Sequence, residues 1–285
     1  TQTRTAFIAI VGCPNVGKSS ILNRLLGQKV AVVSPKPQTT RTKIMGVLTE
    51  DEVQLVFTDT PGFHRPRTKL GEKMIKAVSD SISGVDACLF VVEPSGELRD
   101  AEKDLLKKFK DEKLPVILAI NKIDSVKQKE LLIERMAQFS ALYDFEAIVP
   151  CSALKGDGFG DLKDELFKQA QPSPHFFPDD TLTDQPERVL AAEIIREKLL
   201  NLLDDEVPHG VAVCIERMHE REDSNITDID ATIYCERESH KGIIIGKKGE
   251  MLKKVSTKAR EDMERFFMCK INLHCWVKVK EGWRN

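Results

Sequence analysis

The sequence has few of the features that mark secreted or membrane-spanning proteins. Seven cysteines are scattered over 285 residues, their number is odd, and no C-x-x-C pair occurs. This spacing argues against a disulfide framework or a zinc site and favours a reducing cytosol. No apolar run approaches the roughly 20 residues that a membrane-spanning helix needs, and no signal-peptide pattern opens the chain. We therefore expect a cytoplasmic protein.

Length and charge point to two domains of different character. A chain of 285 residues is long for one hydrophobic core, and 41% hydrophobic with 31% charged residues is typical of a soluble globular protein. Residues 1–171 carry 25 basic and 23 acidic side chains, residues 172–239 carry 6 and 17, and residues 240–285 carry 12 and 5. The basic end of an otherwise acidic chain suggests contact with a polyanion; the alternative is an ordinary solvated face.

One stretch near the start fits G-x-x-x-x-G-K-S/T, the phosphate-binding loop of nucleotide hydrolases. An apolar run at residues 6–11 predicts a buried strand before it, and residues 20–26 predict a helix after it. This strand–loop–helix context is what the motif requires. We assign to nucleotide binding Gly12, Cys13, Pro14, Asn15, Val16, Gly17, Lys18, Ser19 and Ser20.

Each polar group of this loop has an expected partner. Gly12 and Gly17 let the backbone turn its N–H groups onto the β-phosphate, and the helix N-terminus adds its dipole. Lys18 should reach the β- and γ-phosphates, and the Ser19 hydroxyl should bind Mg²⁺.

A second motif, D-x-x-G, follows two strands predicted at 45–48 and 53–57. Asp59 is expected to hold Mg²⁺ through water, and the Gly62 N–H to bond the γ-phosphate. Hydrolysis would break that bond and release the loop that follows. The residue after Gly62 is Phe63, whose side chain cannot hydrogen-bond the attacking water. Slow intrinsic turnover is therefore expected.

The loop at residues 34–42 can supply one more magnesium ligand. Its two prolines exclude helix and central strand, and its position allows a threonine hydroxyl to swing onto the ion. Thr40 is our choice and Thr39 the alternative. The predicted metal ligands are thus Ser19, Thr40 and Asp59, and the predicted catalytic residues are Lys18, Thr40, Gly62 and Asn15.

Two further motifs predict that the base is guanine. N-K-x-D follows a strand at 116–120, and its Asp124 carboxylate can accept two hydrogen bonds from guanine, a donor pair that adenine lacks. Asn121 and Lys122 should brace the loop and cover the base. After a strand at 147–150 comes Ser152-Ala153-Leu154, where the Ala153 N–H should donate to the guanine oxygen.

Four motifs in this order, each at the carboxyl end of a strand, match ligand binding by an open α/β sheet. The region 1–171 resembles the translation-factor-like GTPases. We therefore expect a P-loop GTPase domain with a mostly parallel sheet flanked by helices, binding GTP and GDP.

A proline-rich stretch at 172–186 reads as a linker, in which Phe176 and Phe177 could dock onto one domain. Residues 187–285 then predict a helix at 187–203, strands at 211–215 and 229–235, a helix at 250–267 and an alternating strand at 271–279. A G-x-x-G loop precedes the second helix. This order resembles a type II KH domain, a small α+β fold whose loop clamps about four single-stranded nucleotides. The predicted RNA-binding residues are Ile244, Ile245, Gly246, Lys247, Lys248, Gly249 and Lys253.

Within that loop, Gly246 and Gly249 permit close approach, and Lys247 and Lys248 neutralise phosphates. Ile244 and Ile245 would offer an apolar floor for bases.

One GTPase domain, a proline linker and a KH domain resemble the Era family of bacterial ribosome-assembly GTPases, with W-V-K-V-K at 276–280 as a further shared motif. The resemblance implies binding to the 3′ end of 16S ribosomal RNA, a role in 30S subunit assembly, and peripheral association with the inner face of the cell membrane. We expect a monomer that uses Mg²⁺. An asparagine at the place of Asn15 resembles a potassium ligand in several related GTPases; the alternative is that Asn15 only caps the turn.

Two interpretations of the function remain at this point. In the first, GTP hydrolysis times the release of bound RNA. In the second, the chain is a constitutive RNA-binding assembly factor for which GTP is mainly a structural ligand. The full set of magnesium and base-reading groups favours the first, and Phe63 keeps the second open.

Overall fold

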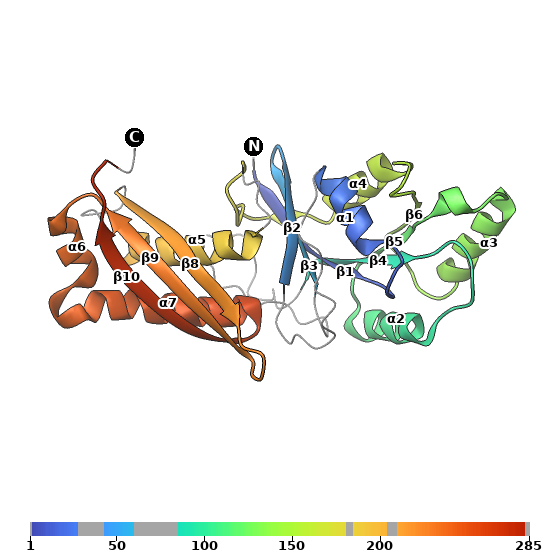
Figure 1. Ribbon diagram of the computed structural model, residues 1–285. Helices are drawn as coiled ribbons and strands as arrows, with labels where there is room; N and C mark the ends of the chain where they lie inside the picture. The colour runs from blue at the N-terminus through green and yellow to red at the C-terminus, as the bar shows by residue number, and fades with distance from the viewer. Residues whose placement is uncertain (1, 28–42, 60–84, 181–184, 204–209, 283–285) are drawn as a thin grey trace. The chain divides into compact units, whose positions relative to one another are not determined.

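The computed structural model describes residues 2–27, 43–59, 85–180, 185–203 and 210–282. These residues divide into two compact units, one extending to residue 180 and the other beginning at Gln185, each with its own sheet (Figure 1). No helix in the described ranges combines the length and hydrophobicity that crossing a bilayer requires. Residues 70–83, for which the sequence pattern predicts a helix, lie outside the described residues.

The first unit is built on a mostly parallel sheet, as predicted. In its described part the strand order is β2-β3-β1-β4-β5-β6, with β2 antiparallel to β3 and the short β7 antiparallel to the start of β1. The strands are β1 (Arg4–Val11), β2 (Lys43–Glu50), β3 (Val53–Asp59), β4 (Ala87–Val92), β5 (Val116–Ile120), β6 (Ala147–Pro150) and β7 (Gln171–Pro172). All residues of β4 and β5 are buried, which is why they read as continuous apolar runs.

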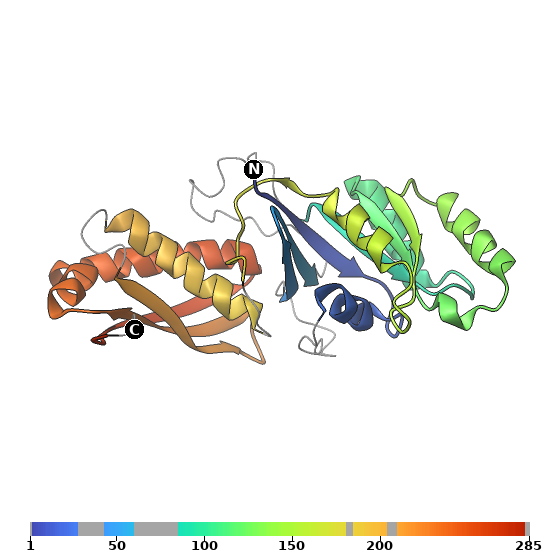
Figure 2. The same ribbon diagram turned by 90° about the horizontal axis from the view of Figure 1, so that it is seen from above.

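Helices cover both faces of this sheet (Figure 2). On one face, α1 (Lys18–Leu26) and α4 (Phe159–Phe167) contribute apolar side chains to a shared core with the strands. On the other, α2 (Asp100–Glu112) and α3 (Lys129–Ser140) place Phe109 and Phe139 edge-on against Phe90 of β4, with ring centroids 5.3 and 6.2 Å away. The sequence pattern predicts helices at about 101–110 and 127–139, where α2 and α3 lie, but does not predict α4.

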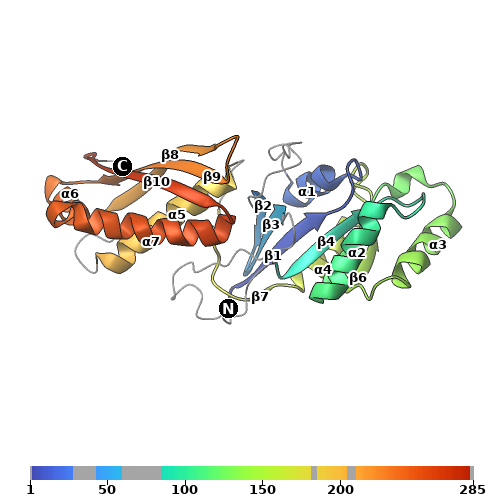
Figure 3. The same cartoon turned by 90° about the horizontal axis from the view of Figure 1, so that it is seen from below.

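The second unit places its helices on one face of a three-stranded sheet (Figures 2 and 3). The strand order is β10-β9-β8, with β9 parallel to β10 and antiparallel to β8. The elements are α5 (Pro186–Leu202), β8 (Val211–Glu220), β9 (Ile226–Cys235), α6 (Glu238–Ile245), α7 (Glu250–Phe267) and β10 (Lys270–Val279). The core comes from α5 and α7, where every third or fourth residue, such as Val255, Ala259 and Met263, is fully buried.

One element of the second unit was not predicted. Residues 238–245 form the helix α6, although the sequence analysis treated the Ile243–Ile245 run only as an apolar stretch before the loop. A run this short fits a strand or a buried helix equally well, so periodicity could not identify it.

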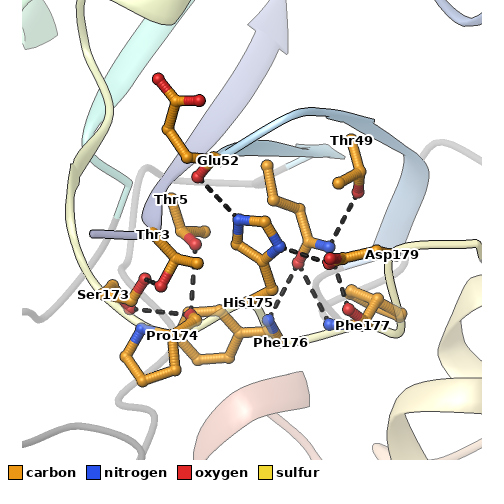
Figure 4. Close-up of polar contacts among 11 residues, drawn as sticks. Thr3, Thr5, Thr49, Glu52, Ser173, Pro174, His175, Phe176, Phe177 and Asp179 are labelled. Atoms are coloured by element: carbon orange, nitrogen blue, oxygen red, sulfur yellow. Dashed lines mark hydrogen bonds and ion pairs between the residues drawn. The ribbon is translucent and has the colours of Figure 1, made fainter. Parts of the chain in front are cut away.

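The first part of the proline-rich stretch packs on the first unit (Figure 4). Thr3, just before β1, exchanges two hydrogen bonds with Ser173, and the ring centroids of Phe176 and Phe7 lie 4.9 Å apart. Gln54 of β3, which is fully buried, accepts from the N–H groups of Phe176 and Phe177 and donates to the Phe177 carbonyl. Phe176 and Phe177 therefore dock onto the first unit, as the sequence analysis allowed.

Candidate nucleotide-binding site and RNA-binding loop

The phosphate-binding loop joins β1 to α1 and depends on its two glycines. A Cβ atom at Gly12 would lie 2.6 Å from the Val91 carbonyl oxygen, and one at Gly17 would lie 2.2 Å from the Asn121 amide nitrogen. Gly17 also has φ of 99°, a conformation that other residues rarely adopt. The loop can therefore lie against β4 and the Asn121 loop only because Gly12 and Gly17 have no Cβ atom.

Lys18, the first residue of α1, folds back over the loop. Its ammonium group donates to the Gly12 carbonyl at 2.6 Å. Burial lowers the pKa of Lys18, and the nearby Cys13 and Asp59 partly oppose that shift. Asp59 ends β3, so the lysine and the predicted magnesium partner meet at the carboxyl edge of the sheet. A nucleoside triphosphate with its Mg²⁺ ion would need this arrangement.

The residues present fit a magnesium ion that is held mainly by phosphates. Ser19 is exposed in the first turn of α1, and Asp59 is partly exposed at the same edge. Over the described ranges, no three His, Cys, Asp or Glu side chains gather into a metal cluster. Mg²⁺ commonly takes one or two protein oxygens, substrate phosphates and water, so a dense acidic cluster is not required. The other predicted groups of this centre, Thr40, Thr39 and Gly62, lie outside the described residues.

Asn121 connects three loops from inside the protein. Its side chain is 2% exposed, donates to the Val16 carbonyl at 2.9 Å and accepts from the Ala153 N–H at 3.0 Å. Lys122 crosses to the phosphate loop as well, donating to the Asn15 carbonyl at 2.6 Å. Both residues brace the loops, as the sequence analysis proposed.

Asp124 is exposed, and a hydrogen bond from Ser152 holds its side chain in place. Ser152, which is fully buried, donates its hydroxyl to one Asp124 carboxylate oxygen at 2.7 Å. The Ala153 N–H, expected to donate to guanine, donates here to Asn121, so its contact with the base stays a prediction. Leu154 next to it is 73% exposed and can cover a flat ligand.

Two residues that the sequence analysis missed support this site. Arg24, six residues after Lys18 on α1, donates from its guanidinium to the Ala153 and Leu154 carbonyls, both at 3.1 Å. Glu93, just after β4, lies 3.7 Å from the Lys122 ammonium and 3.4 Å from the Arg99 guanidinium. Neither stands in a recognisable motif, because each acts on a loop far away in the sequence.

The G-x-x-G loop connects α6 to α7 through a single 3₁₀ turn at Lys247–Gly249. Gly246 and Gly249 both have φ of 74°, and Lys248 has φ of 57°. A Cβ atom at Gly246 would lie 2.6 Å from the Met251 Cβ, so this turn also requires glycine. Lys247, Lys248 and Lys253 are exposed, in position to contact a polyanion.

One predicted RNA contact is wrong. Ile244 is fully buried, so its side chain cannot touch a base as the sequence analysis expected. The reason is the helix α6, which turns this residue into the core. Ile245 is partly exposed and remains a candidate for the apolar floor.

The fold and the loops together define a P-loop GTPase with a separate KH-type RNA-binding unit. Two family models match the same regions: "50S ribosome-binding GTPase" over residues 7–122 and "KH domain" over residues 206–284. The GTPase Era of Clostridioides difficile is 49% identical over 282 residues, which cover 99% of this chain and 95% of the relative. That of Ruminiclostridium cellulolyticum is 50% identical with 99% and 94% coverage. The chain belongs to the Era family of GTPases.

Solved structures agree with this assignment. A crystal structure of an Aquifex aeolicus Era variant bound to GDP·AlF₄⁻ is 38% identical, with a TM-score of 0.51 and coverage of 99% of this chain and 96% of that one. A second Era structure, in complex with MgGDPNP and nucleotides 1506–1542 of 16S ribosomal RNA, is 37% identical with a TM-score of 0.51 and coverage of 99% and 95%.

Proposed function

We propose that this GTPase is a switch that holds the 3′ end of 16S ribosomal RNA in its GTP state, releases it after hydrolysis, and so assists assembly of the 30S subunit. One observation carries the proposal: a guanine-reading site braced by Asn121 and Ser152 stands on the same chain as an exposed basic G-x-x-G loop. The Era relative that was solved with 16S ribosomal RNA supports this choice of RNA.

The experiment that tests this proposal is GTP hydrolysis with and without RNA fragments of the 16S 3′ end. A switch predicts a change in turnover when the fragment binds, and a lower RNA affinity of the GDP-bound protein than of the protein with a non-hydrolysable GTP analogue. Equal turnover with and without the RNA, together with equal RNA affinity in both nucleotide states, would favour the alternative. In that case GTP would be a structural ligand of a constitutive RNA-binding factor.

We further propose the ions that serve the site. Mg²⁺ fits Ser19, Asp59 and Thr40, and the MgGDPNP complex of the Era relative supports it. A potassium ion at Asn15 would offset charge that accumulates between the β- and γ-phosphates during hydrolysis. Asn15 is exposed in the phosphate-binding loop, and its φ of 66° keeps it out of regular structure.

The place of action is inferred from the family resemblance and from composition. We propose a cytoplasmic monomer with peripheral association at the inner face of the cell membrane. The scattered cysteines fit a reducing compartment, and five of the seven are buried as free thiols.

A further inference from the structure

The outer face of β10, together with the residue that follows the strand, carries an exposed row of aromatic and basic side chains. His274, Trp276, Lys278 and Lys280 are all exposed and alternate along the chain, and Trp276 is 50% exposed. Alternate residues on a strand share one face, so the row extends for about 20 Å. A half-exposed tryptophan on an open sheet is unusual for a residue that only packs a core.

The row faces away from the helices of its unit. Between its members lie Cys275 and Val277. Burial raises the pKa of the Cys275 thiol, an effect that the nearby Ser256 of α7 partly offsets, and Val277 is buried. The helices lie behind the sheet in the view of Figure 1, and Figures 2 and 3 agree. The aromatic and basic row therefore belongs to the sheet face that the unit's own helices leave uncovered.

A tyrosine of the neighbouring strand β9 extends the row. Tyr234 of β9 pairs with Lys278, and the Lys280 ammonium lies 5.8 Å from the centre of the Tyr234 ring. His274 and Trp276 have ring centroids 6.1 Å apart.

Two carboxylates on this face, Asp228 and Asp230, have arginine partners. Hydrogen bonds from Arg221 and Asn272 hold the pKa of Asp228 well below its usual range, and Asp230 lies 3.9 Å from Arg217. Glu216, at the β8 irregularity, accepts from the Tyr234 hydroxyl at 3.5 Å. With Asp228 and Asp230 paired to arginines, Lys278 of β10 and Lys280 just after it leave the row with a positive character.

The basic end of the row lies at the same end of the unit as the G-x-x-G loop. β9 and β10 are parallel, and Val279 pairs with Cys235, the last residue of β9. The chain enters α6 three residues after Cys235 and reaches the G-x-x-G loop after eight helical residues, about 12 Å along the helix. Figure 1 shows α6 beside the carboxyl ends of both strands.

We propose that this row, His274, Trp276, Lys278 and Lys280 with Tyr234, is a second contact for single-stranded RNA, which takes the strand as it leaves the G-x-x-G loop. Aromatic rings offer stacking surfaces to unpaired bases and lysines neutralise phosphates, so alternation of the two suits a single strand. One G-x-x-G loop clamps about four nucleotides, and a longer segment needs such a surface. The inference rests on the proposed RNA-binding function.

Fluorescence can test the contact directly because the chain has two tryptophans. In a Trp283→Phe background, Trp276 is the sole tryptophan of these 285 residues. We expect its emission to be quenched, and its accessibility to acrylamide to fall, when an RNA of about 12 nucleotides copying the 16S 3′ end binds, but not with one of about four nucleotides. Unchanged emission and accessibility at saturating RNA would overturn the proposal.

The RNA affinities of matched variants provide a second test. Trp276→Ala should weaken binding of the longer RNA roughly tenfold and leave the shorter one unaffected, while Trp276→Phe should keep most of the affinity. Ile133→Ala, which removes another exposed apolar side chain from the first unit, should change neither. Full affinity of Trp276→Ala for the longer RNA would also refute the contact.

The Lys247→Ala, Lys248→Ala double variant separates the two proposals, since it should weaken both RNAs. If it does so and the Trp276 variants do not, the second contact fails and the proposed function stands. If the unmodified protein binds neither RNA, both fail. If Trp276→Ala impairs binding to small-subunit particles but not to free RNA, the row contacts a protein instead and the RNA assignment is wrong.

Discussion

The guanine-reading site and the G-x-x-G loop achieve order in different ways. In the first, buried side chains fix three loops: Asn121 bonds both Val16 and Ala153, and Ser152 holds Asp124. In the second, the backbone alone makes the shape, through the positive φ of Gly246, Lys248 and Gly249, while the lysine side chains stay exposed.

Because of this difference, the nucleotide site provides specificity for a base, whereas the G-x-x-G loop provides affinity for a phosphate backbone. A braced site with a positioned carboxylate rejects a base that cannot pair with it, since an unpaired polar group is costly. An exposed cationic loop attracts any phosphate backbone, and salt weakens that attraction. We therefore expect single substitutions to abolish nucleotide recognition, and loop substitutions to have graded, salt-dependent effects on RNA.

The largest effect should come from Asp124→Asn. Two hydrogen bonds to a charged acceptor, each about 1.5–3 kcal/mol, would be lost, so GTP affinity should fall at least roughly a hundredfold. Xanthine nucleotide should become the better ligand, because its extra carbonyl matches the new amide donor. Calorimetric titration with GTP, xanthosine triphosphate and ATP measures this. Unchanged GTP affinity, or equal native affinity for ATP, would remove the guanine assignment.

The Lys247→Ala, Lys248→Ala double variant should show the contrasting behaviour. RNA affinity should fall, and the slope of log affinity against log salt should decrease by about 1.4 for a single strand. GTP affinity and intrinsic hydrolysis should stay in place, because the site is on the other unit. An RNA affinity with the same salt slope as the unmodified protein would show that this loop is not the RNA clamp.

A smaller effect is expected from exchanging the monovalent cation. If Asn15 holds potassium, hydrolysis should be several-fold faster in K⁺ than in Na⁺ at equal ionic strength, measured with RNA present. Asn15→Ala should abolish the difference and spare GTP binding, since the phosphate loop backbone remains. Equal hydrolysis rates in the two salts would show that Asn15 does not hold potassium and only caps the turn.

The smallest effect should come from Arg24→Ala, which tests whether Arg24 helps to hold the loop at Ala153 and Leu154 in place. Loss of the two bonds to the Ala153 and Leu154 carbonyls should weaken GTP binding about fivefold, corresponding to about 1 kcal/mol for exposed bonds. Arg24→Lys should recover part of it with one donor. Arg196→Ala, another exposed arginine, serves as the control. An effect no larger than that of the control would show that the loop holds its shape without Arg24.

The sequence predicted the main architecture because its signals are local. The glycine–lysine loop, the N-K-x-D run and the apolar strands each follow from residues close together in the chain, and the predicted bounds of α7, 250–267, are those observed. The same holds for the G-x-x-G loop, whose glycines occupy conformations that few other residues adopt.

The tertiary structure decided what depends on distant contacts. Arg24 reaches a loop 129 residues away, and Gln54 fixes Phe177 over 123 residues, so no local pattern marks either of them. The short run before the G-x-x-G loop became a helix, which buried Ile244 and left Ile245 partly exposed. A sequence pattern determines which face of an element is apolar, whereas packing against other elements decides which of its residues a ligand can reach.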